Sequence, residues 1–195
     1  DILVIPDALG IKVDFVKNHG PKIAKFDLEK DLKNLKIANI NNHLQNVYEA
    51  ITLTKSNLAK DKALIGFCGA PFTLACYMLE GGGSKNFEIV KEISIKYPEK
   101  FSQLIDILTD SAMKFLTLQI NAGVDLAITI TGVAGPTGGT KDKPVGTVCF
   151  GWVVRNAAGE TTTHCETKLF NGNRQAIRQQ ATEHALAVLV QLLND

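Results

Sequence analysis

A glycine-rich segment, residues 131–144, carries the side chains of this chain that are best suited to binding chemistry. Its sequence is TGVAGPTGGTKDKP. Backbone N–H groups beside glycines can turn toward one point and bind an anion, while nearby hydroxyl and ammonium groups add contacts to a phosphate. The candidate binding residues are Thr131, Gly132, Gly135, Gly138, Gly139, Thr140 and, from a later segment, Arg174. A tight structural turn would explain the same glycines, so both interpretations stay open.

Metal and redox chemistry are not indicated by the sequence. The four histidines are scattered without ligand spacing, and the four cysteines form no C-x-x-C pair: His19, His43, His164, His184, Cys68, Cys76, Cys149 and Cys165. We therefore expect no metal and no cofactor. Small buried thiols are the simplest interpretation of the cysteines, and they favour a reducing, cytoplasmic compartment.

Composition excludes several classes of protein. The chain has 195 residues, of which 45% are apolar and 21% are charged, enough for one sizeable core or two small ones. A formal net charge of +1 favours neither nucleic acid nor an anionic membrane as a partner. No apolar run is long enough to predict a transmembrane helix. The first residues, DILVIPDALG, lack a methionine and a basic region, so we expect a chain cut from a longer one rather than a signal peptide.

The use of basic residues changes near residue 125. Residues 1–125 contain fifteen lysines and no arginine, whereas residues 126–195 contain three of each. Lysine and arginine are similar helix formers on a surface, so protein physics does not require this change. Two sources joined near residue 125 explain it, and a small-sample fluctuation is the alternative.

Apolar periodicity and turn signals predict an α/β fold that must position the candidate residues. Strands are expected at ILVIP (2–6), IKVDFV (11–16), ALIGF (63–67) and VDLAITIT (124–131), followed by a hairpin around NAAG (156–159). Helices are expected over 38–59, from Pro71 to about Leu79, after the possible cap Ser84, from Pro98, and at the end after Asn171 or Asn173.

The first 125 residues resemble uroporphyrinogen decarboxylase. The resemblance lies in DILVIPDALG, ITLTKSNL, LIGFCGAPFTLACYMLEGGGSK and the AGVD that opens the next strand. It implies a TIM barrel that decarboxylates the acetate side chains of a tetrapyrrole without a cofactor. It also implies that Asp1 stabilises a cationic pyrrole, that Tyr77 lines the site, and that Phe67 is a pocket aromatic. The alternatives are a solvated chain end for Asp1 and a core tyrosine with its hydroxyl at the rim for Tyr77.

Residues 126–195 resemble the C-terminal half of a nicotinamide-nucleotide amidase, a domain also found at the end of competence-damage-inducible proteins. The segments ITITGVAGPTGGTKDKPVGTVCFGW and FNGNRQAIRQQATEHALAVLVQLL carry this resemblance. It implies hydrolysis of the carboxamide of nicotinamide mononucleotide. The ESCTGG-like nucleophile turn and the SNEAK-like segment of that family do not occur in this chain.

The two resemblances meet inside one strand, at AGVD/LAIT. We therefore predict an α/β sandwich in which parallel strands from a TIM-barrel fragment are continued by an amidase-type strand, a β-hairpin and a C-terminal helix. One composite domain would then span residues 1–195, with 1–125 derived from the barrel and 126–195 from the amidase. Whether such a fusion is natural, selected or engineered stays open.

The favoured functional hypothesis is a chimeric protein without an intact active site, because the join divides each catalytic set. Asp1 and Tyr77 would then be vestigial. An amidase-like hydrolase or a nucleotide or phosphate binder is the first alternative, and decarboxylation of a tetrapyrrole is the second. Expected partners are a weakly bound anion or nucleotide and a second copy of the chain, since a cut sheet leaves open edges. No nucleic acid or membrane partner is expected.

Overall fold

The computed structural model describes residues 2–16, 20–84, 87–156 and 158–194. Contacts between Cα atoms divide the chain into two compact units. The helical unit comprises Asp1–Asn57 and Phe67–Gly123, and the sheet unit comprises Leu58–Gly66 and Val124–Asp195. The expected α/β character is confirmed as a mixture of helix and sheet, while one composite domain over residues 1–195 stays a prediction.

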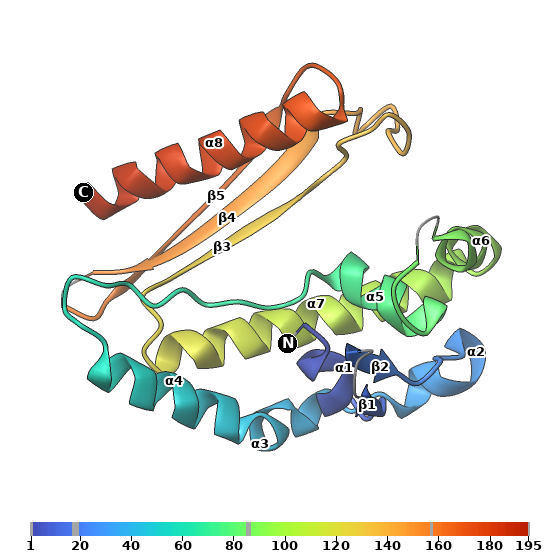
Figure 1. Ribbon diagram of the computed structural model, residues 1–195. Coiled ribbons are helices and arrows are strands. Elements are labelled where there is room, and N and C mark those ends of the chain that lie inside the picture. The colour runs from blue at the N-terminus through green and yellow to red at the C-terminus, as the bar shows by residue number, and fades with distance from the viewer. Residues whose placement is uncertain (1, 17–19, 85–86, 157, 195) are drawn as a thin grey trace. The chain divides into compact units, whose positions relative to one another are not determined.

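The helical unit is built around one long helix (Figure 1). Its elements are α1 (Val4–Ala8), β1 (Val13–Val16), β2 (Gly20–Ile23), α2 (Leu28–Asp31), η1 (Leu32–Asn34), η2 (Ile37–Asn39), α3 (Ile40–His43), α4 (Gln45–Asn57), α5 (Pro71–Glu80), α6 (Glu88–Lys96) and α7 (Pro98–Asn121). Leu104, Leu108 and Phe115 recur at helical spacing along α7 and are buried in its core. Proline at the first turn of α7 has no N–H group to leave unpaired, so it starts this helix at little cost.

Helix α5 follows the predicted signals at both ends. It begins at Pro71, and it ends where Gly81 adopts a left-handed φ of 74° and donates its N–H group to the Tyr77 carbonyl at 3.0 Å. Helix α6 begins at Glu88 with Phe87 at its N-cap position, so Ser84 does not cap this helix as predicted. The Ser84 hydroxyl accepts a hydrogen bond from the Phe87 N–H group at 3.1 Å.

The strand predicted at residues 2–6 is wrong, because this segment forms α1. Its backbone groups pair along the helix, with the Asp7 N–H donating to Leu3 O at 3.1 Å and the Leu9 N–H donating to Ile5 O at 3.0 Å. Ile5 is fully buried. A strand needs a neighbour for its backbone hydrogen bonds, whereas a helix satisfies its own. An apolar run of this length does not distinguish the two.

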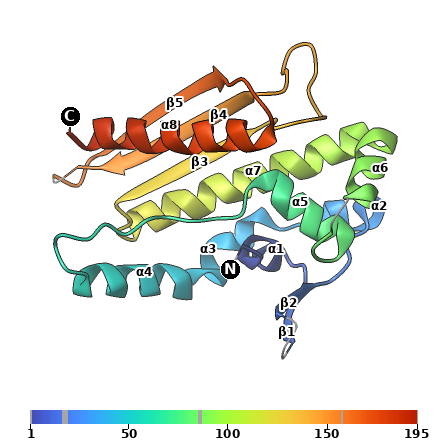
Figure 2. The same cartoon turned by 45° about the horizontal axis from the view of Figure 1, so that its top comes forward.

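The sheet unit holds β3 (Leu126–Gly132), β4 (Thr147–Arg155), β5 (Thr161–Leu169) and α8 (Arg174–Asn194). The strands pair antiparallel in the order β3-β4-β5, and α8 lies along one face of this sheet (Figure 2). Alternate β4 residues, including Phe150 and Trp152, are buried with Ile177 and Ala181 of α8. The Trp152 indole Nε1 donates to the Ala185 carbonyl at 3.0 Å.

Two asparagine side chains accept backbone hydrogen bonds in the sheet unit, one at the hairpin turn and one at the start of α8. Asn156 Oδ1 accepts hydrogen bonds from the N–H groups of Ala158 and Glu160, which closes the predicted hairpin turn. Asn173 Oδ1 accepts from the Ala176 N–H at 3.0 Å. Of the two asparagines proposed to cap the last helix, Asn173 therefore makes the capping bond.

The predicted parallel sheet is reduced to a short contact at the start of β3. Ile65 and Leu126 form an isolated parallel bridge, with the Gly66 N–H donating to Leu126 O at 2.7 Å. The Leu64 N–H donates to the Asp125 carboxylate at 2.7 Å, and Asp125 N–H donates back to Leu64 O at 2.8 Å. This is the only parallel pairing among the described residues, so the sandwich with continued parallel strands is not confirmed.

Candidate functional site

The glycine-rich loop between β3 and β4 is closed at its neck by two backbone hydrogen bonds. The Val133 N–H donates to Thr147 O at 2.9 Å, and the Gly146 N–H donates to Val133 O at 2.7 Å. At the tip, the Thr140 N–H donates to Lys143 O at 2.9 Å, while the Lys143 N–H donates to the Thr140 hydroxyl at 3.0 Å. Hydrogen bonds within the loop therefore fix its conformation at both the neck and the tip.

Two of its glycines are required because Val145 approaches their backbone closely. Gly135 is buried with a φ of 76°, and a Cβ added there would lie 2.5 Å from Val145 Cγ1. A Cβ added at Gly139 would lie 2.7 Å from the Val145 amide nitrogen. These approaches support the structural interpretation of the glycines.

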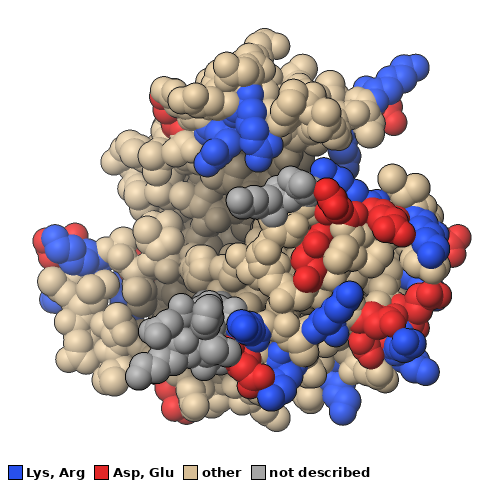
Figure 3. All heavy atoms as spheres, turned by 45° about the vertical axis from the view of Figure 1, so that its right-hand side comes forward, with Lys and Arg blue, Asp and Glu red and all other residues tan. Residues whose placement is uncertain are grey.

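Arg174 joins the loop to the start of α8. Its guanidinium Nη1 donates to the Gly135 carbonyl at 2.9 Å. The candidate residues Thr131, Gly132, Gly138, Gly139 and Thr140 are exposed. The structure thus brings Arg174 and the loop together, as a binding site for an anion requires. Figure 3 shows basic and acidic side chains interspersed on the face that it presents, rather than a field of one sign.

The residues implied by the decarboxylase resemblance lie in the helical unit. Asp1 lies outside the described residues. Tyr77 is half-buried in α5 and packs against the core of that unit. Phe67 has 55% of its surface exposed, and its backbone pairs with the buried amide of Gln119, which donates to Phe67 O at 2.8 Å and accepts from Phe67 N–H at 3.0 Å. Phe67 and Tyr77 therefore belong to a different unit from the glycine loop and Arg174.

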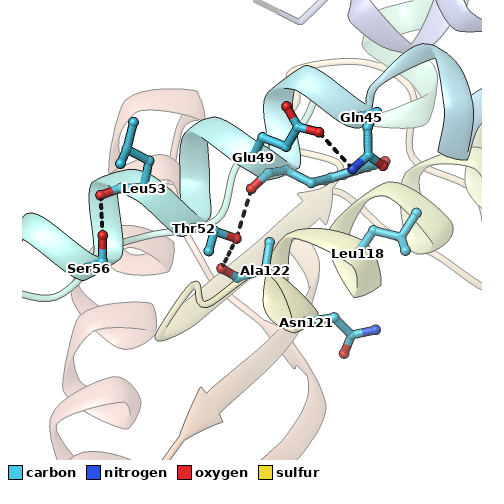
Figure 4. Close-up of a pocket in the computed structure, with 9 residues that line it drawn as sticks. Gln45, Glu49, Thr52, Leu53, Ser56, Leu118, Asn121 and Ala122 are labelled. Atoms are coloured by element: carbon cyan, nitrogen blue, oxygen red, sulfur yellow. Dashed lines mark hydrogen bonds between the residues drawn. The ribbon is translucent and has the colours of Figure 1, made fainter.

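A cavity of about 540 Å³ between α4 and α7 of the helical unit was not foreseen. Figure 4 shows polar side chains of α4 around it, with Thr52 Oγ1 donating to Ala122 O at 3.0 Å and Gln45 Nε2 donating to Glu49 Oε1 at 3.1 Å. Tyr48 also lines it, and within the described residues the buried Tyr48 hydroxyl has no hydrogen-bond partner. Burial raises the pKa of the Tyr48 phenol.

A second unforeseen cluster lies between β5 and α8. His184 Nε2 and Glu166 Oε1 are 2.5 Å apart, and Lys168 Nζ lies 3.9 Å from Glu166 Oε2. The hydrogen bond from His184 lowers the pKa of the Glu166 carboxyl. With His164 these residues line a cavity of about 440 Å³. The alternation HCETK gave a signal for a polar strand face, but nothing local connected it to a histidine eighteen residues later.

Neither a metal site nor a membrane span is found in the part of the chain that the structure describes. No three His, Cys, Asp or Glu side chains gather there as metal ligands would. None of the described helices is both long enough and apolar enough to cross a bilayer.

Comparison with known families supports the two resemblances predicted from the sequence. The family model of uroporphyrinogen decarboxylase matches residues 1–135.

This chain belongs to the uroporphyrinogen decarboxylase family.

The decarboxylase match is joined by a second one, because the CinA C-terminal domain matches residues 112–193. The chain therefore has two parts, one decarboxylase-like and one CinA-like. Both matches include residues 112–135, which contain the end of α7, the predicted join and β3.

Curated decarboxylases match the first part closely. Uroporphyrinogen decarboxylase of Campylobacter concisus is 45% identical over 126 residues, and that of Campylobacter hominis is 42% identical over the same length. Each alignment covers 64% of this chain and 37% of the relative. The chain thus spans little more than a third of the length of these decarboxylases.

Solved structures of competence-damage proteins also match this chain. The competence-damaged protein superfamily member from Klebsiella pneumoniae is 32% identical, covering 51% of this chain and 54% of that chain with a TM-score of 0.31. The competence or damage-inducible protein from Enterobacter asburiae is 23% identical, covering 80% and 98% with a TM-score of 0.35. Superpositions at these scores do not establish a shared fold for the whole decarboxylase-family chain.

Proposed function

We propose that this chain catalyses neither decarboxylation of uroporphyrinogen nor hydrolysis of the carboxamide of nicotinamide mononucleotide. The observation that carries the proposal is the small number of described strands in the helical unit, which holds the decarboxylase candidates Phe67 and Tyr77. A TIM-barrel site is assembled from the carboxyl ends of many strands. The described part of the helical unit has only the two-stranded hairpin β1–β2, which supplies no such ring of strand ends.

We infer that the amide hydrolase activity lacks the serine nucleophile expected from the resemblance. Nucleophilic hydrolysis uses a serine, threonine or cysteine held beside a base. All five serines precede residue 112, so the sheet unit contains none. The Thr140 hydroxyl is engaged as an acceptor for the Lys143 N–H group, which turns it toward the loop's own backbone.

The test is an assay of the purified chain with both substrates. We expect no carbon dioxide from uroporphyrinogen and no ammonia from nicotinamide mononucleotide above the rate without protein. Loss of a nucleophile costs several powers of ten in rate, so the difference from a working enzyme would be large. Ammonia released in proportion to added protein and abolished by Thr131→Ala would overturn the proposal.

A second candidate function is weak binding of a phosphate or nucleotide by the glycine loop. It is favoured by the hydrogen bond from Arg174 to Gly135, which keeps a guanidinium beside the exposed loop. Chemical-shift titration with nicotinamide mononucleotide and with ribose 5-phosphate tests it. We expect weak, salt-sensitive binding of both ligands, because the phosphate is their shared group.

Arg178 provides the matched control for this titration. It lies one turn after Arg174 on α8 and is exposed. Arg174→Ala should abolish the shifts at Gly138 and Gly139, whereas Arg178→Ala should leave them. Equal effects of the two variants, or no shifts in the wild type, would contradict binding at this loop.

The finer description of the fold also stays a proposal. One composite domain, with barrel-derived parallel strands continued through β3, is supported by the bridge between Ile65 and Leu126. It predicts one cooperative unfolding transition, seen at the same denaturant concentration by every probe. A cytoplasmic location is proposed on the four unpaired cysteines alone.

A further inference from the structure

Strand β5 has an open edge in the described sheet. It is the outer strand of the order β3-β4-β5, and eight of its nine residues are exposed. Its sequence, TTTHCETKL, contains no proline or glycine and is rich in threonine, which favours regular strands. An edge of this length without a bulge or proline is a template for pairing with another strand.

Hydrogen bonds at both ends of the hairpin show which backbone groups face outward. The Asn156 N–H donates to Glu160 O at 2.9 Å, and the Phe170 N–H donates to Gly146 O at 2.9 Å. Bonded pairs alternate along an antiparallel ladder, so the even-numbered residues of β5 bond to β4. The odd-numbered residues therefore turn their N–H and C=O groups toward the open edge: Thr161, Thr163, Cys165, Thr167 and Leu169.

We propose that two copies of this chain pair through their β5 strands, antiparallel and about a two-fold axis at Cys165. All nine residues of β5 then take part. Thr163 lies opposite Thr167 of the second copy, and His164 lies opposite Glu166 of the second copy. A polar contact between histidine and a carboxylate and threonine pairs across strands stabilise a sheet. The result is a continuous six-stranded sheet.

The side chains that face each other and the length of the ladder favour this register over the other possible registers. Moving the axis to His164 sets the two His164 side chains against each other, and moving it to Glu166 opposes two carboxylates. Axes at Thr163 or Thr167 leave only five residues of β5 paired with β5. The axis at Cys165 alone combines the full ladder with complementary side chains.

The sheet face that carries α8 has room for this arrangement. Helix α8 packs mainly on β4 and β3, and it reaches β5 through the contact of His184 with Glu166, which leaves the backbone edge of β5 open. With neighbouring strands about 4.8 Å apart, the two β4 strands would lie about 14 Å from each other. Packed helices need about 8–10 Å, so the two α8 helices do not collide. The side chains of alternate β5 residues from each copy would lie between the two helices: His164, Glu166 and Lys168.

Cys165 supplies a direct test. In a hydrogen-bonded antiparallel pair the Cα atoms are about 5.5 Å apart, within the range that a disulfide spans. We expect mild oxidation of the purified chain to give a disulfide-linked dimer on a non-reducing gel. Cys165→Ala should abolish it. Cys149→Ala should not, because Cys149 is equally an exposed thiol but lies on the central strand β4.

Two proline variants test the hydrogen-bonding edge without any thiol. Thr163→Pro removes an outward N–H group and should shift the dimer's dissociation constant at least about tenfold with unchanged circular dichroism. Thr162→Pro removes an N–H group that bonds to β4 and should lower the unfolding temperature instead. Wild-type protein that sediments as a monomer at high concentration would overturn the proposal. So would a cross-link that survives Cys165→Ala, or a dimer unaffected by Thr163→Pro.

Discussion

Replacing Tyr48 by phenylalanine should stabilise the helical unit. Tyr48 is 8% exposed, its ring centroid lies 6.0 Å from that of Phe115, and its hydroxyl has no partner within the described residues. A buried polar group without a hydrogen bond costs about 1–3 kcal/mol relative to its hydrated state. Phenylalanine keeps the ring contact and leaves a void of only one oxygen. We therefore expect a gain of about 1 kcal/mol in the free energy of unfolding.

Urea unfolding measures this gain with a probe for each unit. For a denaturant slope of about 1–3 kcal/mol per molar, the midpoint should rise by about 0.3–1 M. Trp152 is the single tryptophan and is fully buried in the sheet unit, so its fluorescence reports that unit. Far-ultraviolet circular dichroism reports mainly the helices. A rise in the dichroism midpoint alone indicates separate unfolding, and an equal rise in both indicates one composite domain.

Tyr77→Phe is the matched control, because Tyr77 is half-buried on α5 and its hydroxyl can reach water. We expect a midpoint within experimental error of the wild type. A lower midpoint for Tyr48→Phe would refute the reasoning, since it would show that the Tyr48 hydroxyl makes a stabilising hydrogen bond in the folded protein.

Three further predictions concern the loop, a carboxylate and the thiols. Gly135→Ala should cost about 2–4 kcal/mol, because its Cβ overlaps a valine side chain at positive φ. Gly138→Ala should cost about 1 kcal/mol by tryptophan fluorescence in urea, because its added Cβ would lie 3.7 Å from Val133 Cγ1, an ordinary contact, and only the positive φ is unfavourable. The lowered pKa of Glu166 gives stability that is present above the unfolded carboxyl value of about 4.3 and is lost as the pH falls through the folded value. Glu166→Gln should therefore flatten the urea midpoint against pH in this acid range, and an unchanged profile would argue against the histidine partner. Burial, with a nearby glutamate, raises the pKa of Cys76 to about 11. At pH 8 it should react with a disulfide reagent at least about 100-fold more slowly than the exposed Cys149, and equal rates measured on single-cysteine variants would contradict the buried position.

The sequence by itself determined the elements whose signals are local. Proline at the first turn and glycine at the end defined α5, and apolar residues at helical spacing defined α7. Alternating residues around an asparagine turn gave the β4–β5 hairpin, and Asn173 started α8. The motifs also separated the decarboxylase-like part from the CinA-like part, because both sets of residues are contiguous in the chain.

Only the tertiary structure decided the features that depend on distant partners. Residues 2–6 became α1, and the strand predicted at residues 63–67 became a single bridge to Leu126. A strand exists only where a neighbour takes up its hydrogen bonds, and an apolar run does not say whether that neighbour is present. The contact of His184 with Glu166 and the unpartnered hydroxyl of Tyr48 likewise depend on how helices pack, which the spacing of residues along the chain does not encode.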